Sequence, residues 1–265
     1  MKKLLITVGL TLLIAGCNFE SNEAEVAEQV EQKQPFSEYL TCTPGINFTN
    51  DSVRSMITEW NALELDESLY FAAGHAPLSE TSLGGSGKVY WQLFWESKED
   101  ANEAWAEGPS EEFLAWGEKF QDVLVCDGDG RRGYDVYWGR ENDKSGDWED
   151  ESQWVTYAHY CKYTSLGDIE ALGSSMVEFN EYLDNVESGD DGPFTFGVFL
   201  HNSDNKEPYI NYDFFWMNYY QNHDDAMASY ERYEQTGSEM QATFDEFSVC
   251  EGPFPSNSFR FLSVN

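Results

Sequence analysis

Basic residues are scarce in this sequence, which has 15 Lys+Arg against 49 Asp+Glu among 265 residues and a formal net charge of −34. Binding to nucleic acid or to an anionic lipid surface by charge needs Lys and Arg side chains that displace counterions, so the composition excludes both. Disorder of the whole chain is also excluded, because 16% of the residues are aromatic and can form a core. The length suffices for one large domain or two small ones.

Metal-binding and nucleotide-binding motifs are missing as well. The four histidines form no H-x-x-x-H pair and the cysteines form no C-x-x-C pair. No G-x-S-x-G, Walker or dinucleotide fingerprint occurs. The segment 127–130 (Asp-Gly-Asp-Gly) lacks the later ligands of a calcium loop and is interpreted as a turn. We therefore predict no metal site and no cofactor.

The one long apolar run stands near the start of the chain. It covers Leu4 to Ile14 after two lysines, which is too short to span a bilayer and has the layout of a secretory signal. The sequence 14–17 (Ile-Ala-Gly-Cys) resembles a bacterial lipobox. The resemblance implies cleavage of the signal peptide 1–16 and lipidation of Cys17. An ordinary signal peptide with an incidental cysteine is the alternative.

The residue after that cysteine is Asn18 rather than Asp. By the Gram-negative sorting rule, the lipobox resemblance then implies an anchor in the outer membrane of the cell envelope, on its periplasmic or surface face. Residues 17–36 are polar and acidic, and we predict a flexible tether there. A short solvated helix ending at Pro35 is the alternative.

The rest of the chain contains two similar copies. Residues 59–61 (Glu-Trp-Asn) recur as 178–180 (Glu-Phe-Asn), and residues 125–128 (Val-Cys-Asp-Gly) recur as 249–252 (Val-Cys-Glu-Gly). The matches keep their order and include paired cysteines, so they indicate a duplicated unit of domain size. The predicted divisions are repeat 1 over 37–142, an acidic linker over 143–153 and repeat 2 over 154–265.

Each copy predicts the element order β-α-β-β-α-β of the ferredoxin-like unit. Alternating apolar residues indicate the strands, and apolar residues at a 3–4 spacing indicate the helices. Helices are expected to begin near residues 50, 97, 110, 169 and 223. The expected strands cover residues 37–43, 69–76, 88–96, 133–140, 154–163, 194–201, 209–220 and 259–264.

Both faces of the expected third strand carry large aromatic residues. Trp91 and its alternate neighbours share one face, while Tyr90, Gln92 and Phe94 share the other. A water-facing sheet would not carry so many, so we expect the sheet of the other copy to cover the second face. Two such units joined face to face resemble the dimeric α/β-barrel superfamily. The resemblance implies an α+β fold of two ferredoxin-like βαββαβ repeats packed as a fused pseudo-dimeric α/β barrel, and a monomeric protein.

Four cysteines remain besides Cys17, and they occupy equivalent places in the two copies. Cys42 and Cys161 lie on expected first strands, and Cys126 and Cys250 precede expected last strands. In the ferredoxin-like topology these strands are antiparallel neighbours. We therefore predict the disulfides Cys42–Cys126 and Cys161–Cys250, which an oxidising periplasm supports. A metal site and free buried thiols are the alternatives.

The expected inner face supplies a candidate ligand site, because aromatic walls with a few polar groups are typical of small-molecule pockets. Two histidines at equivalent strand ends complete the set. The alternatives are a packed core between sheets and partly exposed strand-end histidines. The candidate ligand-binding residues are Tyr90, Gln92, Phe94, Trp216, Asn218, Tyr220, His75 and His201.

An aromatic lining without convergent acid, base or metal-binding side chains favours binding over catalysis. We expect a membrane-anchored, non-catalytic lipoprotein that binds a small apolar or aromatic ligand or a protein partner. The superfamily resemblance implies an alternative, a cofactor-independent monooxygenase-like enzyme. The superfamily also includes heme-degrading enzymes with an Asn/Trp/His set, but the expected first strands supply no Asn. No catalytic residue is assigned.

Overall fold

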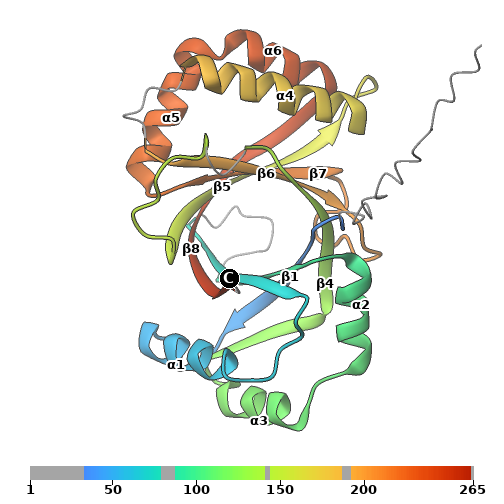
Figure 1. Ribbon diagram of the computed structural model, residues 1–265, viewed down its shortest axis with the longest axis vertical. Helices are drawn as coiled ribbons and strands as arrows, with labels where there is room; N and C mark the ends of the chain where they lie inside the picture. The colour runs from blue at the N-terminus through green and yellow to red at the C-terminus, as the bar shows by residue number, and fades with distance from the viewer. Residues whose placement is uncertain (1–32, 79–86, 141–143, 187–191, 264–265) are drawn as a thin grey trace, which may run out of the picture. The chain divides into compact units, whose positions relative to one another are not determined.

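The computed structural model describes residues 33–78, 87–140, 144–186 and 192–263, which belong to one unit (Figure 1). The predicted signal peptide, Cys17 and nearly all of the predicted tether lie outside the described residues, as does the acidic run 187–191. Within the described part of the chain, no helix has the length and apolar character to cross a membrane.

The described residues form eight strands and six helices. In the first half these are β1 (Phe36–Pro44), α1 (Asn50–Trp60), β2 (Leu69–Pro77), β3 (Val89–Trp95), α2 (Lys98–Glu107), α3 (Glu111–Phe120) and β4 (Leu124–Trp138). In the second half they are β5 (Gln153–Tyr163), α4 (Ile169–Val186), β6 (Phe194–His201), β7 (Phe214–Tyr220), α5 (His223–Thr236), α6 (Ser238–Phe247) and β8 (Ser248–Ser263).

All the strands belong to a single closed antiparallel barrel with the order β1-β3-β2-β8-β5-β7-β6-β4. The two halves are hydrogen-bonded to each other along two seams, where β2 pairs with β8 and β4 pairs with β6. The predicted fold class, two ferredoxin-like repeats packed face to face as a fused pseudo-dimer, is therefore wrong. Two open sheets packed face to face would have exposed edge strands. Closure into one barrel removes these edges.

The physical reason lies in the length of β4 and β8. The sequence predicted the last strands over 133–140 and 259–264, whereas β4 has 15 residues and β8 has 16. The first part of each strand pairs within its own half, with β1 or β5, and the last part pairs across the seam with β6 or β2. The predicted turn at 127–130 is also wrong, because these residues lie inside β4 at an irregularity in its pairing with β1.

Strand β7 differs by one residue from the register that the sequence repeat predicted. The prediction placed Tyr90 and Trp216 on the same face. In the structure Val89 of β3 lies opposite Cys42, whereas Phe214 of β7 lies opposite the equivalent cysteine of β5. Val89 and Phe214 are therefore equivalent positions. Tyr90 follows Val89 by one residue and Trp216 follows Phe214 by two, so their side chains point to opposite faces. Successive strand residues point to opposite faces, so a slip of one residue exchanges the inside and the outside.

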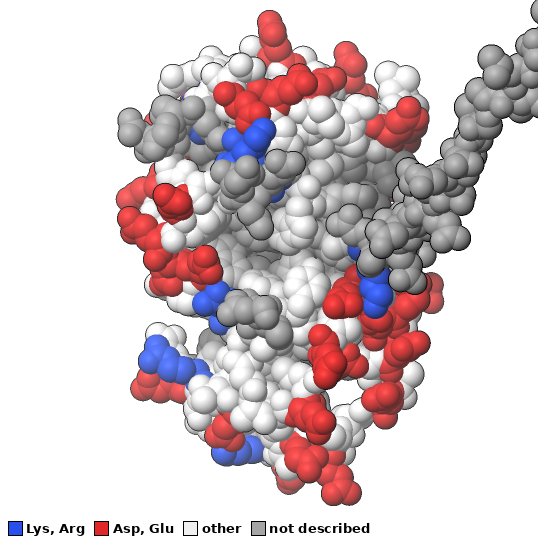
Figure 2. Space-filling view, in the orientation of Figure 1, with Lys and Arg blue, Asp and Glu red and all other residues white. Residues whose placement is uncertain are grey.

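Three apolar clusters follow from this arrangement. Helices α1, α2 and α3 cover the outer face of the first half, and α4, α5 and α6 cover that of the second half (Figure 1). One cluster lies beneath each helical layer, and the third fills the barrel interior with side chains such as Tyr39, Phe94, Phe199 and Phe215. Acidic side chains gather over the helical layers and along both flanks, while the face between them is largely uncharged (Figure 2).

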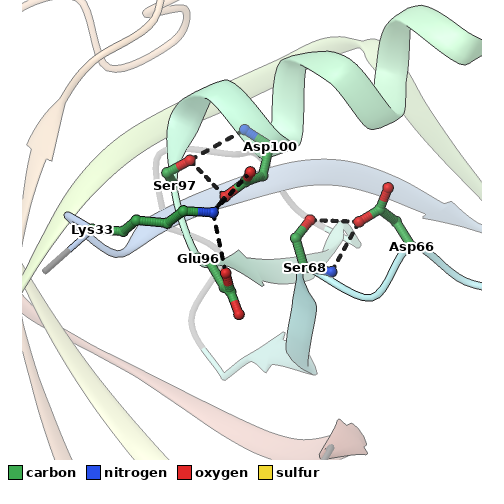
Figure 3. A network of polar contacts seen from close by, with 6 residues as sticks. All are labelled: Lys33, Asp66, Ser68, Glu96, Ser97 and Asp100. Carbon is green, nitrogen blue, oxygen red and sulfur yellow. Dashed lines mark hydrogen bonds and ion pairs between the residues drawn. The ribbon is translucent and has the colours of Figure 1, made fainter. Parts of the chain in front are cut away.

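The start of α2 shows how short polar residues fix the chain locally (Figure 3). Ser97, near which a helix was expected to begin, is the N-cap of α2, and its Oγ accepts a hydrogen bond from the backbone N–H of Asp100 at 3.2 Å. Lys33 Nζ pairs with Glu96 Oε2 at 3.2 Å and with Asp100 Oδ2 at 2.9 Å. These contacts hold the segment before β1 against the helix.

Both predicted disulfides are confirmed. Cys42 is bonded to Cys126 and links β1 to β4, while Cys161 is bonded to Cys250 and links β5 to β8. In each pair the two cysteines lie directly opposite each other in the strand register. Each bond therefore connects the first and last strands of one half.

Candidate functional site

The structure divides the predicted ligand-binding residues between two sites on opposite sides of the sheet. Tyr90 and Phe94 belong to the barrel interior, where Gln92 is also buried and hydrogen-bonds to His75. The β7 members, Trp216, Asn218 and Tyr220, instead point outward beneath the second helical layer. The structure therefore brings each trio together but separates one trio from the other.

His75 is a buried residue rather than an exposed strand-end histidine. Its Nδ1 lies 2.8 Å from Ser258 Oγ, and its Nε2 lies 2.8 Å from Gln92 Oε1. Burial lowers the pKa of His75 to about 4, and the hydrogen bond with Gln92 opposes this shift only in part. His75 is therefore neutral at neutral pH and fully engaged by its neighbours.

His201 lies at the end of β6 next to Tyr134, with the two ring centroids 4.5 Å apart. Burial is also the main cause that lowers the pKa of His201 to about 4, and the nearby Lys206 and Arg132 act in the same direction. His75 and His201 thus have different neighbours, although their sequence positions are equivalent.

An aromatic pocket of about 260 Å³ lies beneath the second helical layer. We call it the outer pocket. Its floor is the outer face of β5, β6 and β7, and its roof is formed by α4, α5 and α6. Six of its aromatic wall residues are Phe179, Phe194, Phe214, Trp216, Tyr233 and Phe244.

The aromatic wall is held in place by ring packing. The indole of Trp216 stacks on Phe196 with centroids 4.4 Å apart and an interplanar angle of 7°, and it meets Phe179 edge-on at 5.5 Å. Both contacts bury rings from β6 and α4 against β7. The floor is thereby a rigid aromatic surface, suited to a flat ligand.

One polar chain crosses the floor of the outer pocket. Trp216 Nε1 donates to Asn218 Oδ1 at 2.9 Å, and Asn218 Nδ2 donates to the Tyr230 hydroxyl at 3.1 Å. The Tyr230 hydroxyl lies 2.8 Å from His159 Nε2. Since the Tyr230 oxygen accepts from Asn218, its own hydrogen can be donated to His159. The neutral imidazole of His159 then carries its hydrogen on Nδ1.

Burial sets the protonation of this chain. It lowers the pKa of His159 to about 4, so the imidazole is neutral near neutral pH. It also raises the pKa of Tyr230 well above the usual range, so the phenol keeps its proton. A neutral acceptor and a protonated donor therefore face each other across a short hydrogen bond, which is an arrangement that can relay a proton.

His159 and Tyr230 are not among the site residues that the sequence predicted. The face on which His159 lies could have been predicted. Residues two apart on a strand share a face, and Cys161 of the predicted disulfide lies two residues further along β5. Tyr230 gave no comparable signal, since α5 offers several tyrosines and only packing decides which one reaches the sheet.

Solved structures show the same fold. A proposed monooxygenase from Lactobacillus acidophilus has a TM-score of 0.50 at 11% identity over 86% of this chain and 95% of its own. A proposed monooxygenase from Fusobacterium nucleatum has a TM-score of 0.50 at 6% identity, covering 86% and 93%. A proposed chlorite dismutase has a TM-score of 0.50 at 10% identity, covering 86% and 95%. The structural neighbours are dimeric α+β barrel proteins.

Identities of this size establish likeness of fold and nothing finer. No protein-family model matches the chain, and neither does any curated protein sequence. The comparisons thus establish that these neighbours share the barrel fold of this chain. The function has to be argued from the outer pocket itself.

Proposed function

We propose that the protein is an oxygen-dependent, cofactor-independent monooxygenase acting on a small aromatic compound bound in the outer pocket. The observation that carries the proposal is the ordered hydrogen-bond chain from Trp216 to His159 on the floor of an aromatic cavity. The fold shared with proposed monooxygenases supports the same class of reaction. This is the alternative of the sequence analysis, now favoured over simple binding.

The reaction needs a substrate that can supply all the electrons. An aromatic ketone with an activated CH₂ group, once deprotonated, is electron-rich enough to react directly with O₂. The CH₂ group becomes a carbonyl, one oxygen atom enters the substrate, and the other leaves as water with the two hydrogens. Four electrons leave the carbon and four reduce O₂, so no cofactor is required.

The polar chain supplies the proton transfer that starts this reaction. The substrate proton passes to the Tyr230 oxygen while Tyr230 gives its own proton to His159 Nε2, which lies 2.8 Å away. A low pKa keeps His159 free to accept the proton, and the substrate anion formed beside it then stabilises the imidazolium. Asn218 Nδ2 has a second hydrogen besides the one given to Tyr230, and this hydrogen can be donated to the anionic oxygen. The aromatic walls exclude water.

The test measures oxygen uptake and product absorbance with the full-length chain and anthrone as the probe substrate. We expect turnover by the wild type and a loss of about 100-fold or more in Tyr230→Phe, which removes the relaying hydroxyl. The matched control is Tyr233→Phe, which changes another tyrosine of α5 that lines the same pocket but hydrogen-bonds to Gln241 at 3.2 Å. It should keep wild-type turnover.

Tryptophan fluorescence during the same titration separates binding from catalysis, because Trp216 forms part of the floor. Heme and quinones are tested in parallel as ligands. Quenching without oxygen uptake by any probe contradicts the enzyme proposal and supports a ligand-binding protein. Equal turnover in Tyr230→Phe and Tyr233→Phe removes the proposed proton relay.

We also propose that the chain is a lipoprotein anchored through Cys17 to the outer membrane of a Gram-negative envelope. The lipobox resemblance supports this proposal, although Cys17 lies outside the described residues. Metabolic labelling with palmitate should mark the wild type and leave Cys17→Ala unlabelled. Labelling of both forms, or of neither, contradicts lipidation at this residue.

A further inference from the structure

The barrel interior contains a buried cation without a carboxylate partner. Arg132 of β4 is 3% exposed. Its Nη1 donates to Thr41 Oγ1 at 3.0 Å, and its guanidinium lies 5.0 Å from the ring centroid of Tyr209 and 5.9 Å from that of Tyr90. Among the described residues, no Asp or Glu forms an ion pair with Arg132.

A second feature of Arg132 points to a missing counter-charge. Its Nε is buried and has no hydrogen-bond partner among the described residues, and the same holds for the hydroxyl of Tyr39, the residue opposite Arg132 in the β1–β4 register. A buried charge costs several kcal/mol unless it is paired. Two unsatisfied donors beside such a charge fit an acceptor that carries a negative charge.

The neighbouring phenols cannot provide that charge. Burial raises the pKa of Tyr134 to about 12, even though the adjacent Arg132 acts in the opposite direction. It also raises the pKa values of Tyr39, Tyr160 and Tyr209 well above the usual range. All four side chains are therefore neutral at physiological pH, and the guanidinium is not neutralised by a tyrosinate.

A cavity is present at the same place. It measures about 40 Å³ and is lined by both Arg132 and Tyr39, together with Tyr160, Tyr209 and Phe215 from the second half. This volume holds a few water-sized species and is too small for an anion as large as gluconate. The outer pocket lies on the other side of the same sheet, so the two cavities are distinct.

We propose that this cavity is a binding site for a small monovalent anion such as chloride, held by Arg132 and the Tyr39 hydroxyl. The anion neutralises the buried guanidinium where side chains of both halves meet, and so stabilises the closed barrel. The proposal is independent of the outer pocket. The strongly acidic surface repels anions, which makes a specific interior site distinguishable from general anion binding.

The test compares thermal unfolding of the full-length chain in sodium chloride and in sodium gluconate at equal sodium concentration and pH. Gluconate is too large for the cavity, while both salts screen the acidic surface alike. We expect a saturable rise in Tm of several degrees in chloride over gluconate for the wild type. The expected difference is absent in Arg132→Met, which removes the charge and keeps an unbranched apolar chain.

Arg54→Gln is the matched control, because Arg54 is exposed on α1 and should keep the chloride effect. Broadening of the ³⁵Cl NMR line by the wild type, reversed by added bromide, tests the site without any variant. Equal Tm values of the wild type in the two salts overturn the proposal, and so does a chloride effect that persists in Arg132→Met. An unbroadened ³⁵Cl line would also overturn it.

Discussion

At the residue scale, a chain of buried polar side chains joins five neighbouring strands of the barrel wall. Ser37 accepts from Gln92, which bonds to His75, which bonds to Ser258, which lies 3.2 Å from Thr156. These residues come from β1, β3, β2, β8 and β5 in barrel order. Each polar group is thereby satisfied, which a buried network requires if it is not to destabilise the fold.

Acid should therefore unfold the protein through His75. Its pKa is about 4 in the folded chain and about 6.5 in an unfolded one. Because the unfolded state binds the proton more tightly, the contribution to stability is fully present above pH 6.5 and is lost as the pH falls towards 4. The loss is on the order of 3 kcal/mol. Urea unfolding between pH 7.5 and 4.5 should show a shallower pH dependence in His75→Gln.

Burial also lowers the pKa values of His159 and His201, so the stability of His75→Gln will still depend on pH. The test therefore compares the pH dependence of this variant with that of the wild type. His223→Gln is the control, because His223 is only partly buried at the start of α5. If His75→Gln and the wild type lose stability in parallel over this range, the neutral His75 does not govern acid unfolding.

At the element scale, the seam between β2 and β8 depends on a residue without a side chain. A Cβ at Gly74 of β2 would overlap the ring of Phe261 of β8. That ring packs against Trp91 with centroids 4.8 Å apart. The close approach of the two strands therefore requires a glycine at position 74 and determines where the ring of Phe261 lies.

Gly74→Val should destabilise the protein by about 1–3 kcal/mol, because the ring of Phe261 must move out of a packed site. Gly117→Ala is the matched control, since its added Cβ meets no atom within 4 Å on α3. The alanine should stabilise the protein by about 0.5–1 kcal/mol. Chemical denaturation measures both, and an unchanged free energy of unfolding in Gly74→Val would show that the seam tolerates a larger spacing.

Elements differed in how well the sequence predicted them. The caps at Ser97 and Ser110 mark the starts of α2 and α3 as expected, because a capping hydroxyl acts within one turn. The extents of β4 and β8 were not predictable, since glycines and prolines within them resemble turns. Pairing with strands of the other half keeps these segments extended, and no local pattern encodes that pairing.

At the scale of the whole molecule, each half is held by one disulfide and the halves are joined by hydrogen-bonded seams. Removing Cys42–Cys126 by a double alanine substitution should cost about 4–5 kcal/mol, an upper figure from loop-closure entropy. This bond lies away from the outer pocket, which is lined by Cys161 and Cys250. Ligand quenching of tryptophan fluorescence should therefore survive in the folded variant.

Calorimetry of the oxidised protein and of the double variant measures this difference. The reduced wild type is the control for effects of the alanine substitutions themselves, because it loses both disulfides while its sequence is unchanged. An unchanged Tm in the double variant would contradict the expected contribution of this disulfide to stability.

The acidic charge, the positions of most helices and strands, and the pairing of the cysteines could be predicted from the sequence. These depend on composition, on local periodicity and on which strands neighbour each other within one half. The tertiary structure alone decided that the strands close into one barrel and which face of β7 is inside. A slip of one residue between the halves moves Trp216 and Asn218 from the interior to the outer pocket. That register is set by pairing between distant strands, so the site that we propose could be located only in the folded chain.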